Sequence, residues 1–209
     1  FRLIRIVVPM ALVTGYLSRN ALYLAQNWQG SGVAGADSGR KGVEYLRVIR
    51  DLAMNPAWIG ISEQAADCSA ALDWIGTHIG PVNRELHGIL QECLSCFHAS
   101  QRPAVQIFAA PILTKAGVDG FCNLEVQPVT LVVDPERVIY SDWYKLVMHE
   151  LAHGIARTAG HGEKFRLALA HLCLAFDLPP PPAVDAGQRL QSWPPYGSHE
   201  NQSGFWQSS

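Results

Sequence analysis

The chain has 209 residues, of which 48% are hydrophobic and 16% are charged, and its formal net charge is −2. This composition can fill the core of one domain with extensions, and it excludes a chain that is disordered throughout. The balanced charge excludes a general attraction to nucleic acid or to an anionic membrane, and no run of Lys and Arg forms a local basic patch.

Residues 1–42 are interpreted as an N-terminal extension that ends in a connection rich in Gly and Ser. Within it, Phe1–Leu17 carries two arginines ahead of an apolar run that is too short to span a membrane. It also lacks the small-residue cleavage site of a signal peptide. We expect this segment to pack on the core as a strand or a helix. The glycines from Gly30 to Gly42 lack the spacing of a phosphate-binding loop, so a flexible connection is predicted there.

Residues 43–178 are predicted to form the folded domain, which begins with three helices. Apolar residues recur with a helical period over Val43–Met54. A second helix is predicted over Ser62–Ile79, with the serine as its cap and Gly80 as its stop. The third helix covers Pro81–Cys96, because proline is favoured in the first turn of a helix.

Three short apolar runs then predict three strands, at Ala104–Ala109, Gly120–Val126 and Val129–Val133. They are bounded by prolines or by an Asp-Pro pair, and they are rich in β-branched residues or alternate between apolar and polar ones. The predicted fold class is therefore α+β, with a small sheet of three or more strands packed against helices.

Two helices complete the domain. The first is expected to begin at Ser141 and Asp142 and to end at Gly160. Ser141 would cap this helix, and Asp142 would complement the positive end of the helix dipole. The second covers Glu163–Phe176, and the prolines of Pro179–Pro182 end it. The first helix carries its own apolar stripe, formed by Tyr144, Val147, Met148, Leu151 and Ile155.

Residues 179–209 are rich in Pro, Gly, Ser and Gln, a composition that is typical of a disordered tail. Within it, Trp193–Tyr196 could serve as a polyproline-type ligand for a partner, although a tail that covers the surface is the simpler interpretation. The alternative to disorder is that the tail docks on the body through its aromatic residues Trp193, Tyr196, Phe205 and Trp206.

The residues His149, Glu150 and His153 form an HExxH motif in the first of these two late helices. Histidines four apart lie one turn apart on one face, where both imidazoles can bind one metal ion. Glu150 is out of line with them, so its carboxylate can reach a metal-bound water and act as a general base. The alternative to a metal site is that the motif consists of two solvated histidines beside an unrelated glutamate.

A catalytic zinc needs a third protein ligand and an open fourth position. His161 is the predicted third ligand, because it follows Gly160, where the chain can turn back toward the ion. Glu163, which opens the next helix, and His171, in the middle of that helix, are weaker alternatives.

The segments His149–His153 and Gly160–Phe165 together resemble the signature of the SprT-like zinc metallopeptidases, which is HExxH, a short spacer and Gly-His-Gly-x-x-Phe. The order of a helix, a small sheet and a metal-binding helix is also similar, and the resemblance covers about Pro81–Phe176. It implies a zincin-like fold with Glu150 as the catalyst and a zinc ion held by His149, His153 and His161.

Other zincin patterns fit less well. Metzincins place a third histidine six residues after the second, where this chain has Ala159. Gluzincins need a downstream helical glutamate, and only Glu163 and Glu200 follow. Many SprT-like proteins carry a zinc ribbon of paired cysteines, whereas only Cys173 follows His161 here. Without a ribbon or a basic excess, proteins bound to DNA are not the expected substrate.

A peptidase of this kind needs a strand that binds the substrate backbone and a donor for the oxyanion. The resemblance nominates Val129–Val133 or its neighbour as the edge strand. Tyr140, Tyr144 and Arg157 are candidate donors, although Tyr144 also belongs to the apolar stripe.

The five cysteines are odd in number and scattered, which does not fit a disulfide framework and predicts a reducing, cytoplasmic location. Cys93 and Cys96, with His98 nearby, could bind a structural zinc only with a distant ligand such as Cys68 or Cys122. Buried thiols that pack as small apolar side chains are the simpler interpretation.

The sequence therefore predicts a zinc metalloendopeptidase with a protein or peptide as its substrate. Two alternatives stay open: a SprT-like protease that acts on DNA-associated proteins, and a non-catalytic zinc-binding or structural protein. Covering of the fourth zinc position by Phe1–Trp28 or by the tail would favour the non-catalytic alternative or a latent enzyme.

Overall fold

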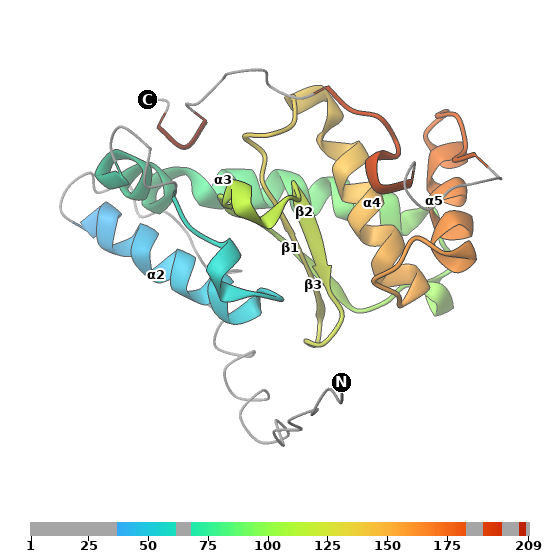
Figure 1. The fold of residues 1–209 in the computed structure, drawn as a ribbon, viewed down its shortest axis with the longest axis horizontal. Coiled ribbons are helices and arrows are strands. Elements are labelled where there is room, and N and C mark those ends of the chain that lie inside the picture. Colours follow the sequence, from blue (N-terminus) through green and yellow to red (C-terminus); the bar gives the residue numbers. More distant parts are fainter. Residues whose placement is uncertain (1–36, 62–67, 183–189, 198–204, 208–209) are drawn as a thin grey trace, which may run out of the picture.

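The computed structural model describes residues 37–61, 68–182, 190–197 and 205–207, and the expectations for Phe1–Leu17 and for Ser62 lie outside them. This part of the chain is an α+β fold (Figure 1). No helix within it is long and apolar enough to cross a membrane. Its helices are α2 (Asp37–Leu52), α3 (Cys68–Ser95), α4 (Trp143–Ala156) and α5 (Glu163–Ala175), and its strands are β1 (Val105–Ala109), β2 (Gly120–Asn123) and β3 (Val129–Val133).

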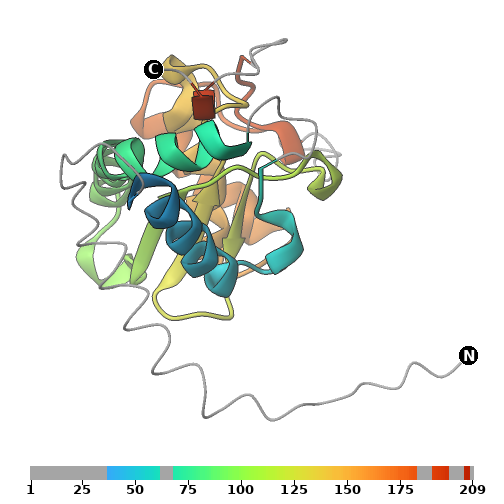
Figure 2. The ribbon, with the colours of Figure 1, turned by 90° about the vertical axis from the view of Figure 1, so that its left-hand side faces the viewer.

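The three strands form a mixed sheet with the order β1-β3-β2. β3 runs parallel to β1, with Val105 opposite Val129, and antiparallel to β2, with Gly120 opposite Val133. The prediction that Val129–Val133 could be an edge strand is wrong, because β3 is the buried centre of the sheet. Its neighbour β2 is an edge. α2 lies on one side of the sheet and α4 and α5 lie on the other (Figures 1 and 2).

β2 ends at Asn123 rather than at Val126, and the Asn123 side chain explains the difference. Its Oδ1 accepts a hydrogen bond from the backbone N–H of Glu125 at 3.0 Å, which turns the chain out of the strand. Its Nδ2 donates to the carbonyl of Leu52 at 2.9 Å, so the same buried side chain also joins the sheet to the end of α2.

The predicted flexible connection is helical where the structure describes it, because α2 begins at Asp37 and includes Gly39 and Gly42. Glycine serves here as a contact residue rather than as a hinge. A Cβ atom at Gly42 would lie 2.1 Å from the carbonyl oxygen of Leu72, and one at Gly76 would lie 1.9 Å from that of Ser38. The two glycines therefore let the backbones of α2 and α3 touch.

The predicted helix boundary at Gly80 and Pro81 is wrong, because α3 runs through both residues. Pro81 removes one hydrogen bond of the helix, and its ring lies on the exposed side. Burial on both sides of the proline outweighs this loss. Ile75 and Ile79 are fully buried before it, and Asn83 after it accepts a hydrogen bond from the N–H of Ala109 at 2.9 Å.

The start of α4 also differs from the prediction, because Ser141 does not cap it. Ser141 lies in the short 3-10 helix Tyr140–Asp142, and Asp142 is the N-cap residue, although its side chain makes no capping hydrogen bond to the backbone of the helix. The Asp142 carboxylate instead accepts a hydrogen bond from the N–H of Gly197 at 2.8 Å and pairs with Lys145 at 3.0 Å. The cap position thus anchors the C-terminal segment.

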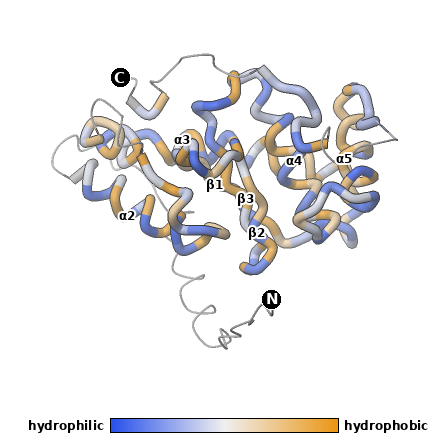
Figure 3. Tube along the Cα trace, in the orientation of Figure 1, coloured by the Kyte–Doolittle hydropathy of each residue, from blue (hydrophilic) through white to orange (hydrophobic). Residues whose placement is uncertain are grey.

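The C-terminal segment docks on the body wherever the structure describes it, so the prediction of a disordered tail is wrong for these residues. Leu190 is fully buried and Trp206 is 4% exposed. The Trp206 ring packs edge-on against Trp74, with centroids 5.6 Å apart, and its Nε1 donates to Asp134 at 3.3 Å. Figure 3 shows the hydrophobic stretches of β3 and α4, whose buried residues form one core with Leu190 and Trp206.

Candidate metal centre

Three histidines gather where α4 meets the turn that leads to α5. His149 and His153 lie on α4, and His161 lies in the turn. One ring nitrogen from each lies within 4.8 Å of the others, and the Nε2 atoms of His149 and His161 are 3.2 Å apart. Across the described ranges no other group of three His, Cys, Asp or Glu side chains is gathered in this way. A single metal ion could therefore be held by all three.

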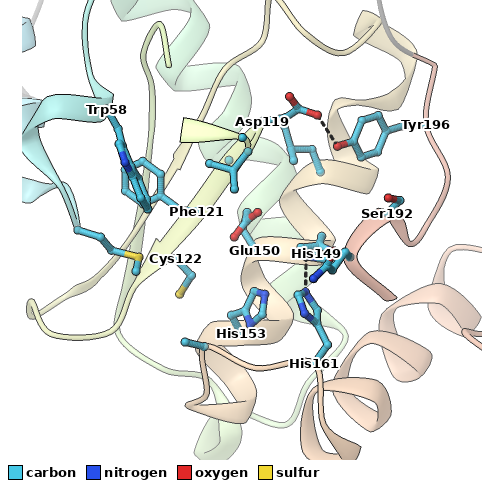
Figure 4. A pocket seen from close by; sticks show the side chains of 17 residues that line it. Trp58, Asp119, Phe121, Cys122, His149, Glu150, His153, His161, Ser192 and Tyr196 are labelled. Atoms are coloured by element: carbon cyan, nitrogen blue, oxygen red, sulfur yellow. Dashed lines mark hydrogen bonds between the residues drawn. The ribbon is translucent and has the colours of Figure 1, made fainter. Parts of the chain in front are cut away.

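The turn that places His161 depends on Arg157, and the prediction that the helix closes at Gly160 is wrong. α4 ends at Ala156, and Arg157 adopts the left-handed conformation with φ 49°. The N–H groups of Arg157 and Thr158 both donate to the carbonyl of His153, which reverses the chain. His161 consequently faces the helix that carries the other two histidines (Figure 4).

Two imidazoles are oriented by backbone carbonyls. His149 Nδ1 lies 2.8 Å from the carbonyl oxygen of Trp193, and His153 Nδ1 lies 2.8 Å from that of Thr158. A carbonyl can only accept, so Nδ1 carries the proton in both rings and the lone pair stays on Nε2. Such outer partners hold metal-binding histidines in one tautomer and orientation.

Phe165 forms the base on which all three imidazoles rest. It is fully buried, and its ring centroid lies 5.1 Å from that of His149, 4.3 Å from that of His153 and 4.7 Å from that of His161. This packing brings the phenylalanine of the segment Gly160–Phe165 into contact with all three histidines.

The variant Phe165→Leu should lower metal affinity about tenfold, because it removes the ring that fixes the three imidazoles. It should also lower the free energy of unfolding by about 1–2 kcal/mol. Phe176→Leu is the matched control, because Phe176 ends the same helix and packs on Tyr144 instead. Titration of each apo-protein with Zn²⁺ checks this, and equal affinities in the two variants would contradict it.

Burial keeps the histidines neutral. It lowers the pKa of His149 and that of His153 to about 4, and it lowers the pKa of the more exposed His161 as well. Neutral imidazoles have the lone pairs that metal binding requires. The alternative of two solvated histidines is wrong, since His149 is 8% exposed and His153 is 7% exposed.

Glu150 lies beside the histidines and is 5% exposed. Burial raises the pKa of its carboxyl to about 8, and the charge of Asp119 adds to the rise. A dication held by the histidines would oppose this shift, because it favours the carboxylate. The side chain packs closely on β2: a Cβ atom at Gly120 would lie 3.2 Å from Glu150 Oε1. The edge strand and the glutamate are therefore in direct contact.

The histidines and Glu150 open onto a cavity of about 430 Å³. Asp119 and Tyr196 also line it, and the Tyr196 hydroxyl donates to the Asp119 carboxylate at 2.7 Å (Figure 4). Burial raises the pKa of Tyr196, so this phenol stays protonated. Sequence reasoning missed Asp119, Trp193 and Tyr196, and no spacing in the sequence connects them to the motif.

The other residues considered from the sequence lie elsewhere. Tyr140 is 63% exposed and donates to Glu85, Tyr144 stacks on Phe176, and Arg157 does not line the cavity. Glu163 pairs with Arg166, and His171 Nε2 bonds to the carbonyl of Cys96. Within the described part of the chain, the cysteines do not gather into a metal-binding group.

The chain matches no protein-family model, no curated protein and no solved structure.

Proposed function

We propose that the chain is a zinc-dependent peptidase of the SprT-like zincin type. The observation that carries the proposal is the gathering of three neutral imidazoles beside a buried glutamate and an open cavity. The Gly-His-Gly-x-x-Phe pattern supports the family, because the histidine and the phenylalanine of this pattern both belong to the site.

Zinc is the metal that this ligand set favours. Three histidine nitrogens with one open position are typical of catalytic zinc. A structural zinc has four protein ligands, whereas the described residues bring three to this place and leave a cavity beside them. This contrast favours a catalytic centre over a non-catalytic zinc protein.

When bound, zinc supplies a Lewis acid that acidifies water and polarises a carbonyl group. Glu150 would accept a proton from the water whose oxygen attacks the peptide carbonyl carbon, and would return it to the amine nitrogen as the C–N bond breaks. β2 holds the substrate, because among the described residues it pairs with β3 alone and its other edge can accept a further strand. Tyr196 also lines the cavity, and to donate to the substrate carbonyl its single phenolic proton would have to turn away from the Asp119 carboxylate, which accepts it at 2.7 Å.

Metal analysis combined with a peptide-cleavage assay tests the proposal. We expect about one zinc ion per chain, cleavage of unfolded peptides, loss of cleavage on chelation and recovery when zinc is restored. Absence of zinc, or cleavage that survives chelation, would contradict it. Salt-sensitive binding of DNA in the same preparation would favour a DNA-associated protease instead.

His161→Ala should lower zinc affinity by at least about 100-fold, since losing a ligand weakens binding more than losing one of its outer partners. His171→Ala is the matched control, because His171 is exposed on α5 and bonds to the carbonyl of Cys96. Competition with a chromogenic chelator measures both affinities. Unchanged affinity in the His161 variant would remove His161 from the site.

A further inference from the structure

We propose that the cavity contains a subsite for a large apolar side chain of the substrate, formed by Met54, Trp58 and Phe121. This inference rests on the proposed peptidase function and names the class of peptide that the site takes.

The three residues form an apolar wall opposite the histidines. Met54 follows α2, Trp58 ends the 3-10 helix Pro56–Trp58, and Phe121 lies on β2. The rings of Trp58 and Phe121 meet edge to face, with centroids 5.7 Å apart. All three line the cavity, and Figure 4 shows Trp58 and Phe121 across it from the histidines. Met54 is 49% exposed although it is a large hydrophobic residue.

The geometry of β2 explains how a substrate reaches this wall. A Cβ at Gly120 would contact Glu150, and the Cys122 thiol lies 3.8 Å from where a Cβ of Gly154 would be, so both residues face α4. Phe121 lies between them and points to the other side, toward Trp58. The side chains of a peptide added to the free edge of β2 would point alternately to the same two faces of the sheet. One side chain next to the scissile bond therefore points to the wall.

The described residues of the cavity wall offer no positively charged side chain to pair with an acidic one. No lysine or arginine is among the described residues that line it, whereas Asp119 and Glu150 are. A basic side chain gains little either, because the Asp119 carboxylate already pairs with Arg137 at 3.3 Å and accepts from Tyr196. Aromatic and large aliphatic side chains fit the wall best, since they bury apolar area without losing a charge partner.

Peptides that differ at one position provide the test. With zinc-loaded protein, we expect kcat/KM for a peptide with Phe at the favoured position to exceed that for Ala by at least about tenfold, and Glu to be the poorest. Met54→Lys should lower this Phe-to-Ala ratio at least about fivefold, because it places a charge on the wall. Val43→Lys is the matched control, since Val43 is also 49% exposed but lies on α2 away from the cavity.

A binding measurement separates this inference from the proposed function. Anisotropy titrations of the same peptides onto zinc-loaded Glu150→Gln should show the same order of affinities. Cleavage with equal rates for Phe and Ala would overturn the subsite and leave the peptidase. A Phe preference that survives Met54→Lys would also overturn it. Failure of every peptide to be cleaved would overturn the proposed function, and the titrations would then decide the subsite alone.

Discussion

The Glu150→Gln variant is expected to bind zinc as tightly as the unmodified chain and to cleave peptides about 10²–10⁴-fold more slowly, a range typical of losing a general base. Glutamine has nearly the same shape as glutamate, so it fits the space beside Gly120 without moving β2. It cannot take a proton from water. His149 and His153 keep their carbonyl partners, and all three histidines keep their packing on Phe165.

Single-turnover cleavage and zinc titration of the same preparation measure the two properties separately. Glu163→Gln serves as the control, because Glu163 is an exposed residue that pairs with Arg166 at 2.7 Å. It should cleave like the unmodified chain. Full peptidase activity in zinc-loaded Glu150→Gln would contradict the proposed mechanism. Loss of zinc from that variant would show that the glutamate has a different role.

Gly76→Ala should lower the free energy of unfolding by about 3 kcal/mol, the upper end of what overpacking costs. The new Cβ would lie 1.9 Å from the Ser38 carbonyl oxygen, and this neighbour is backbone that cannot turn aside. α2 and α3 must then separate, which exposes part of the core they share, including Tyr45 and Ile75.

Gly88→Ala in the same helix is the matched control. No heavy atom lies within 4 Å of its added Cβ, and alanine is the better helix former. It should raise the free energy of unfolding by about 0.5–1 kcal/mol. Urea unfolding followed by circular dichroism compares the two variants. Equal midpoints would mean that the close crossing of α2 and α3 contributes nothing to stability.

Much of the fold is predictable from local pattern, because the strands and the late helices follow short-range periodicity. The strand Val129–Val133 agrees with the prediction residue by residue. The errors concern ends of elements, where local preference competes with tertiary contacts. Pro81 predicts a helix start and lies inside α3, and Gly160 predicts a helix end that Arg157 provides three residues earlier.

The C-terminal segment shows even more clearly that local sequence pattern does not predict tertiary contacts. Its composition predicts disorder, yet Leu190 and Trp206 are buried against the domain. The composition reflects mainly the polar residues and the prolines. A few apolar side chains are nevertheless enough to dock the segment where the domain offers a complementary apolar surface. The Asp134 carboxylate that receives Trp206 lies 72 residues away in the sequence, so no local signal connects the two.

The sequence by itself determined the pair of α4 histidines and their glutamate, because a four-residue spacing on a helix settles which side chains share a face. It also indicated His161, through the glycines beside it. Only the tertiary structure decided what surrounds them: the Trp193 carbonyl behind His149, Tyr196 and Asp119 on the cavity wall, and β2 rather than β3 as the open edge. These features depend on contacts between distant segments, and the packing of the whole core sets such contacts.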